Sequence, residues 1–238
     1  MLEFKNNPRK LMQALDRFLS VYFNDDRVEY KPDLDKIAGW NIPQSLKDIY
    51  SFIGKFQGQS GFLCSNQDSL IINPGDSSFG GKLYIVAEHS GCWTCCTEFE
   101  GEDPPVWTED YGWKDDSPKW KLVHKSLSQF LVAFCLEEAI MASKYRSKIG
   151  GFYSNISSEK IITAINNKGY DVFLLWQDCH IWHAMSDRPI SVDRFFIVED
   201  AILFDGYQCT TNYKNANRLI TSIQAEFKYS VSHIILGT

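Results

Sequence analysis

The stretch that decides the fold runs from Ile42 to Ala87, IPQSLKDIYSFIGKFQGQSGFLCSNQDSLIINPGDSSFGGKLYIVA. Its first part spaces Leu46, Ile49 and Tyr50 as one face of an amphipathic helix, predicted at Pro43–Ile53. Its second part consists of short β-prone runs separated by Gly, Asn, Asp and Pro. The change of period from 3.6 to 2 predicts a helix followed by a sheet, which is an α+β fold.

Further β-prone runs extend this sheet toward the middle of the chain. Strands are predicted at Gly61–Cys64, Ser69–Ile72, Lys82–Ala87, Gly91–Phe99, Val106–Thr108 and Trp120–Val123. Short strands at this spacing predict a central sheet of mixed or antiparallel pairing.

Two more helices are predicted to flank that sheet. The first spans Arg9–Tyr22, with Asn7 as its cap and Pro8 at its first position. The second spans Ser126–Tyr145, where Ser126 and Gln129 match a capping box. On this helix Glu137 and Glu138 are adjacent, so we expect them to diverge into solvent rather than to act as an acid–base pair. The polar residues 24–41 are predicted to be a loop or an irregular insertion.

The last ninety residues return to alternating helices and strands after Gly150-Gly151. The predicted elements are Ser158–Asn166, Val172–Gln177, Cys179–Met185, Phe195–Val198, Ala201–Phe204, Asn215–Phe227 and Tyr229–Leu236. We therefore expect a main domain over residues 1–149. Residues 150–238 are expected to be either an α/β C-terminal extension of the same sheet or a second small domain.

The composition narrows the class of partner. The net charge is −6, and residues 146–238 are balanced, so the negative charge lies in the first part of the chain. Such a surface repels nucleic acid and anionic lipid and attracts basic partners, but on charge alone solubility is the better explanation of the imbalance. An apolar run long enough for a membrane span is missing from the sequence. The seven cysteines are odd in number and irregular in spacing, and no signal peptide is recognised at Met1. These features predict a cytoplasmic protein with reduced thiols.

Three stretches of the first part resemble the SUKH superfamily of bacterial immunity proteins and their eukaryotic relatives. Ile42–Phe52 is similar to the family's "LP…Y…F" helix, with Ile42 in place of Leu. Glu88–Trp93 resembles its Glu-x-x-Gly turn entering an aromatic strand. Glu102–Trp107, followed by Ser126–Ala139, resembles its "DPPV" strand and closing "FL…EA" helix. After the first of these helices the family usually has Asn and Gly, of which this chain keeps only the Gly.

The resemblance covers about three fifths of the chain. It implies an α+β fold with a mixed central sheet. It also implies a non-catalytic protein, without cofactor, that binds and neutralises a cognate toxin, often a nuclease. Composition and periodicity do not themselves indicate this role.

Motifs that suggest chemistry are better explained as structure. In a strand, Cys92 and Cys95 point to opposite faces, and a second ligand pair for zinc is missing. Cys179 and His183 would share a face but lie about 13 Å apart, too far for one ion. Gly58–Phe62 lacks the second Gly of a nucleophile elbow. We therefore expect no catalytic, metal or cofactor site.

The best candidate surface is the acidic and aromatic stretch from Glu98 to Asp116. Carboxylates would steer a basic partner and aromatic rings would anchor it. The candidate partner-binding residues are Glu98, Glu100, Glu102, Asp103, Trp107, Glu109, Asp110, Tyr111, Trp113, Asp115 and Asp116. The alternative for this stretch is a solvated loop whose aromatic rings turn into the core.

Two other functions stay open. One is a scaffold or regulatory interaction domain without a toxin partner. The other is a hydrolase or transferase with a site near Cys179, His180 and His183.

Overall fold

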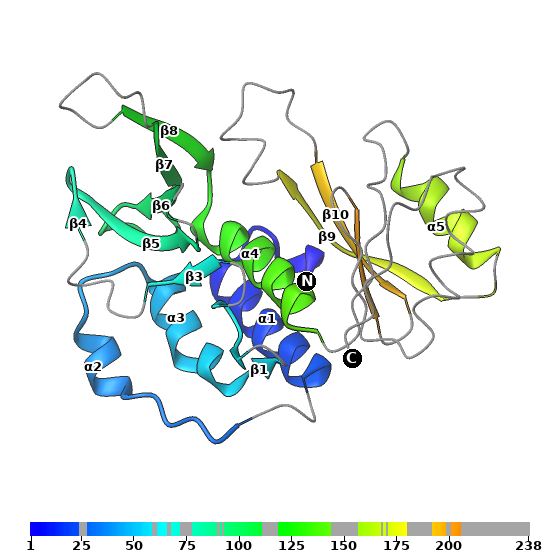
Figure 1. Ribbon diagram of the computed structural model, residues 1–238, viewed down its shortest axis with the longest axis horizontal. Coiled ribbons are helices and arrows are strands. Elements are labelled where there is room, and N and C mark those ends of the chain that lie inside the picture. The colour runs from blue at the N-terminus through cyan, green and yellow to red at the C-terminus, as the bar shows by residue number, and fades with distance from the viewer. Residues whose placement is uncertain are drawn as a thin grey trace.

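The computed structural model describes most of the chain and shows an α+β fold (Figure 1). The described residues are 1–23, 28–58, 61–65, 68–71, 78–89, 91, 93–110, 119–143, 157–167, 169, 171–179, 192–198 and 201–205. The predicted elements Asn215–Phe227 and Tyr229–Leu236 lie outside these residues.

The chain opens with a short 3-10 helix, Leu2–Phe4, and the helix α1, Pro8–Tyr22. The Asn7 side chain accepts a hydrogen bond from the Lys10 amide at 3.1 Å, as the capping pattern predicts. The apolar face of α1 is buried through Leu11, Leu15 and Leu19. Helix α3, Gln44–Phe52, continues into the 3-10 turn Ile53–Lys55 and packs beside α1.

The prediction of an irregular stretch over residues 24–41 is wrong for its second half. Helix α2 spans Leu34–Gly39, and the Asp33 side chain caps it by accepting from the Lys36 amide at 3.0 Å. Only Ile37 of α2 is buried, so this helix lacks the apolar stripe by which a helix is predicted from sequence.

The main sheet is antiparallel in every pairing that the structure describes. Its strands are β3 Asp68–Leu70, β4 Ser78–Phe79, β5 Lys82–Glu88, β6 Thr94–Thr97, β7 Val106–Asp110 and β8 Lys119–His124. Their order is β3-β5-β6-β7-β8, with β4 pairing to β5. A separate short hairpin joins β1, Gln57–Gly58, to β2, Gly61–Phe62. The strand predicted at Gly91–Phe99 is β6, which is shorter than expected.

Helix α4, Leu127–Ala142, is the centre of the core. Phe130, Leu131, Phe134 and Cys135 are buried on it among side chains from α1, α3 and one face of the main sheet. The capping box at its start is half-formed. The Ser126 hydroxyl accepts from the Gln129 amide, but the Gln129 side chain donates to the Lys5 carbonyl instead of returning to Ser126.

The C-terminal part contains α5, Ser158–Asn166, and a second antiparallel sheet. Its strands are β9 Val172–Cys179, β10 Val192–Val198 and β11 Ala201–Asp205, in the order β11-β10-β9. Trp176, Phe195 and Ile202 belong to the same buried cluster as α4, and β9 and β11 both contact α4. The hydrophobic core is therefore continuous between the two sheets.

Among the described residues, we find no helix that is long and apolar enough to cross a membrane.

Candidate functional site

The two faces of the main sheet differ in what covers them. Residues that oppose one another across the strands share a face, and neighbours along a strand alternate. One row runs from Leu83 through Thr97 to Val106, and all three side chains are buried toward the helices. The next row lies on the other face and holds Tyr84, Cys96, Trp107 and Leu122. We call this second face the open face.

The open face carries aromatic side chains that remain partly accessible. Tyr84, Trp107 and Trp120 are half-buried, and Leu122 is 41% exposed. Trp120 opposes Glu109 across β7 and β8, which places it on the same face as Trp107. An antiparallel sheet with one covered face normally shows polar side chains on the other. A row of rings and a leucine there is a departure from that pattern.

Lys82 lies at the centre of this aromatic cluster. Its ammonium is 4.9 Å from the centre of the Trp107 ring and 5.6 Å from that of Trp120. It also forms an ion pair of 2.5 Å with Glu98. The Lys82 side chain is only 12% exposed, so the pair is largely sheltered from solvent. These contacts fix the rings in place by cation–π attraction and neutralise one carboxylate of the acidic stretch.

Asp103 has a structural role that its sequence context does not indicate. Its carboxylate accepts from the Ser128 amide at 2.6 Å, from the Ser128 hydroxyl at 3.0 Å and from the Ser126 hydroxyl. A carboxylate at a helix N-terminus satisfies free amides and favours the helix dipole. Asp103 is half-buried, and these hydrogen bonds make it part of the fold rather than a freely accessible residue of the candidate surface.

The rest of the acidic stretch falls into three groups. Glu100 and Glu102 are exposed in the connection between β6 and β7. Glu109 and Asp110 end β7, where the structure describes their backbone. The predicted residues Tyr111, Trp113, Asp115 and Asp116 lie outside the described residues.

A second group of carboxylates is buried beneath the sheet. Asp68 is 4% exposed and Glu138 is 1% exposed, which corrects the expectation that Glu138 is solvated. The Asp68 amide donates to Glu138 Oε1 at 2.9 Å. Burial, together with the nearby Glu138 and Glu88 carboxylates, raises the pKa of Asp68 to about 7. Burial and the neighbouring Asp68 and Glu138 raise the pKa of Glu137 to about 8.

An apolar cavity of about 470 Å³ lies between α2, α3 and the turn before β3. Trp40, Tyr50 and Leu70 line it, and so does Cys64. Trp40 packs edge-on against Tyr50 with ring centres 5.4 Å apart. Tyr50 donates a hydrogen bond to the Ile71 carbonyl, which ties α3 to the residue after β3.

The cysteine motifs are only partly described. Cys95 is buried in the core with Trp93 and Thr97, and Phe99 packs against the same core, as the alternation predicts. Cys92, His180 and His183 lie outside the described residues, and Cys179 is described only as the end of β9. Within the described part of the chain, we find no group of three or more His, Cys, Asp or Glu side chains placed to hold a metal ion.

Sequence reasoning missed Lys82, Tyr84 and Trp120 as parts of the candidate surface. Along its own strand each of these residues alternates with residues of the opposite face, so the sequence of each strand already indicated which face it occupies. Their convergence depends on the pairing of β5 with β6 and of β7 with β8, which the alternation does not determine.

Comparison of this chain with protein families, with characterised proteins and with solved structures returned no match.

Proposed function

We propose that this chain is a non-catalytic immunity protein that binds and neutralises a basic protein toxin through its open face. The observation that carries the proposal is the partly accessible row of Tyr84, Trp107 and Leu122 on the face that the helices leave uncovered. The toxin as partner class comes from the resemblance of Ile42–Phe52 and Glu102–Trp107 to the SUKH superfamily.

The open face has the features of an energetic hot spot. Rigid aromatic rings give a large contact area at a small cost in conformational entropy, and they dominate binding energy at protein interfaces. Lys82 holds Trp107 and Trp120 in position before a partner arrives. Such preorganisation reduces the entropy lost on binding.

The charge at the edge of this face favours a basic partner. Glu100 and Glu102 are exposed in the connection that leads into β7, next to Trp107. Glu98 is paired with Lys82, and Asp103 accepts hydrogen bonds at the start of α4, so these two carboxylates are committed to the fold. Steering by the described residues therefore rests on Glu100 and Glu102.

The experiment that tests this function is co-expression with the toxin candidate encoded beside the gene for this chain. We expect a stable complex on co-purification and rescue of cell growth by the intact chain. Growth arrest that persists, together with failure to form the complex, would refute the immunity function. A complex with a partner that is harmless to cells would favour the scaffold alternative, which could use the same face.

A further inference from the structure

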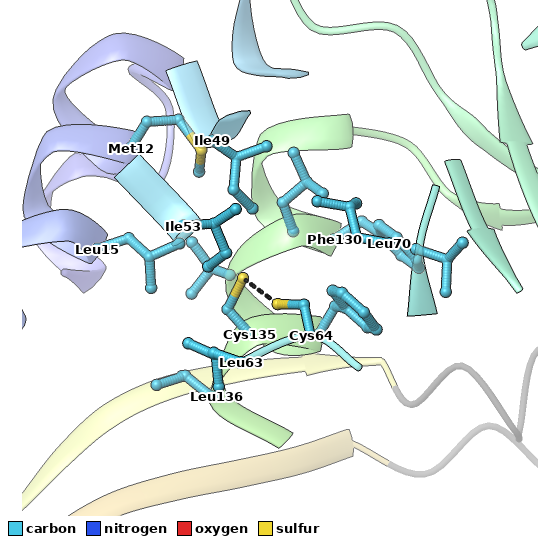
Figure 2. Close-up of a cluster of buried hydrophobic side chains, with 14 of the residues drawn as sticks. Met12, Leu15, Ile49, Ile53, Leu63, Cys64, Leu70, Phe130, Cys135 and Leu136 are labelled. Atoms are coloured by element: carbon cyan, nitrogen blue, oxygen red, sulfur yellow. Dashed lines mark hydrogen bonds between the residues drawn. The ribbon is translucent and has the colours of Figure 1, made fainter. Parts of the chain in front are cut away.

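We propose that Cys64 and Cys135 are a reversible redox pair that closes to a disulfide when a peroxide reaches Cys64 through the apolar cavity. The two thiols come from separate elements, the turn after β2 and the helix α4, and are 71 residues apart in sequence. Their sulfur atoms are 3.7 Å apart and point toward one another (Figure 2). The pair lies on the helix side of the sheet, so this inference is independent of the proposed function.

The two thiols need to move only a little to form a disulfide. A disulfide bond has a length of about 2.0 Å, so the two sulfur atoms must approach by less than about 2 Å. Cys64 is 3% exposed and Cys135 is fully buried, and side chains such as Leu63 and Leu136 surround them (Figure 2). The dense core around the pair keeps the sulfur atoms close to each other.

The backbone at Cys64 adopts a conformation that directs its thiol at α4. Cys64 has a φ of 64°, the left-handed region, and is the only non-glycine residue with positive φ in the described part of the chain. Hydrogen bonds on both sides maintain this turn: Leu63 donates to the Phe56 carbonyl, and Leu70 donates to the Cys64 carbonyl. A left-handed residue other than Gly, Asn or Asp is uncommon and strained, and the surrounding structure must offset that strain.

The cavity supplies a route for a small oxidant. Cys64 lines it directly, together with Ser65, Ser69 and the apolar wall. Cys95 and Cys96 offer no comparable pair, because they are neighbours on one strand and point to opposite faces of the sheet.

The reaction balances with hydrogen peroxide as the oxidant. The Cys64 thiolate attacks one peroxide oxygen, the O–O bond breaks, and with one proton the other oxygen leaves as water. Cys135 then attacks the oxidised sulfur, an S–S bond forms and a second water leaves. Two thiols and one peroxide thus give one disulfide and two waters. Because burial raises the pKa of the Cys64 thiol, the thiolate is scarce at neutral pH and the rate should increase as pH rises.

Peptide mapping of the full chain tests the pair without ambiguity. Complete tryptic cleavage places Cys64 alone in residues 56–82 and Cys135 alone in residues 126–144. The native protein is treated with peroxide, unfolded, alkylated and digested. We expect a cross-linked species that joins these two peptides, has lost the mass of two hydrogen atoms and disappears on reduction. The oxidised protein should also show a Tm higher by about 5 °C, because the cross-link constrains the unfolded chain.

Matched variants separate this pair from the other thiols. Cys135→Ala should abolish the cross-linked species, and Cys96→Ala, which removes another buried thiol, should leave it unchanged. If Cys135→Ala does not fold, the peptide map of the unaltered chain still shows whether the cross-link between Cys64 and Cys135 forms. The proposal is overturned if both peptides remain separately alkylated under conditions that oxidise other cysteines. Oxygen addition at Cys64 without the cross-link would overturn it too.

Discussion

Both sides of the main sheet carry carboxylates, but their surroundings differ. On the open face, Glu98 lies 2.5 Å from the Lys82 ammonium, and Trp107 remains partly accessible beside them. On the inner side, Asp68 and Glu138 are buried close to further carboxylates, and each raises the cost of ionising the next. The carboxylate on the open face holds the Lys82 ammonium beside the aromatic rings, whereas the carboxylates on the inner side store protons.

The difference shows that the local sequence does not reveal what a carboxylate does. Glu102 and Asp103 are adjacent in the chain, yet one is exposed and the other accepts hydrogen bonds at the start of α4. The open face should therefore tolerate substitution without loss of stability, and the inner side should not. The following predictions test that contrast, from the largest effect to the smallest.

The largest effect is expected in the core on the inner side. Phe130→Ala removes a ring that is 1% exposed and leaves a cavity, which should lower the free energy of unfolding by about 3–5 kcal/mol. Leu122→Ala on the open face should cost no more than about 1 kcal/mol, because Leu122 is already 41% exposed. Urea unfolding of both variants measures the contrast, and similar losses would refute it.

The carboxylates of Asp68, which is buried, and Glu137, which is half-buried, should make stability depend on pH. The folded pKa of Asp68 is about 7 and that of Glu137 about 8, both above their ordinary values. The folded state thus binds more protons than the unfolded state between about pH 4 and pH 8. This contribution is complete below about pH 4 and is lost as pH rises through the folded pKa values.

Asp68→Asn provides the control for that pH dependence. It removes one titrating group. It keeps the size of the side chain and the backbone amide of residue 68, which donates to Glu138. Chemical unfolding between pH 5 and pH 9 (about the range in which these groups titrate) should show a flatter profile for the variant. An unchanged profile would mean that Asp68 is not the group responsible.

Asp103 and Glu102 form a matched pair of neighbours, of which Asp103 is bound to the start of α4 and Glu102 is exposed. Asp103→Ala should lower the free energy of unfolding by about 2 kcal/mol, because it leaves the Ser128 amide at the start of α4 without its acceptor. Glu102→Ala should change it by less than about 0.5 kcal/mol. Thermal unfolding of the two variants, followed by circular dichroism, makes this comparison directly.

The smallest effect on stability is expected from charge reversal. Glu100→Lys with Glu102→Lys should leave Tm unchanged but slow association with a basic partner by about tenfold at low salt. Glu29→Lys with Asp171→Lys changes the net charge equally at other exposed sites and should have less effect. Stopped-flow association at two ionic strengths distinguishes them. Equal rates for the two double variants would exclude steering by Glu100 and Glu102.

The sequence was most informative where one physical signal dominated. The helix stripe and the Asn7 cap predicted α1, the position of α5 was predicted to the residue, and α4 ended a few residues early. Helix α2 was missed because it buries only Ile37 and is held mainly by its Asp33 cap. Periodicity cannot detect an element that has almost no buried face.

The candidate site was harder to predict because it depends on register. The acidic stretch was visible in the sequence, but Lys82 reaches it only when β5 pairs with β6 and places Lys82 beside Glu98. The bulges between Tyr84 and Val86 and between Val106 and Trp107 shift that register further. Likewise, Glu138 became buried because α4 lies beneath β3, a contact between segments 70 residues apart.

The central claim is tested most directly by the affinity of two matched variants for the toxin candidate that is encoded beside the gene for this chain. Leu122→Arg places a cation on the open face, and Val21→Arg places the same side chain on α1, where Val21 is 79% exposed. Isothermal titration should show at least about a tenfold loss of affinity for Leu122→Arg, a cost of about 1.4 kcal/mol, and no change for Val21→Arg. Unchanged affinity for Leu122→Arg, in a protein that folds as the parent does, would place the interface elsewhere and contradict the account.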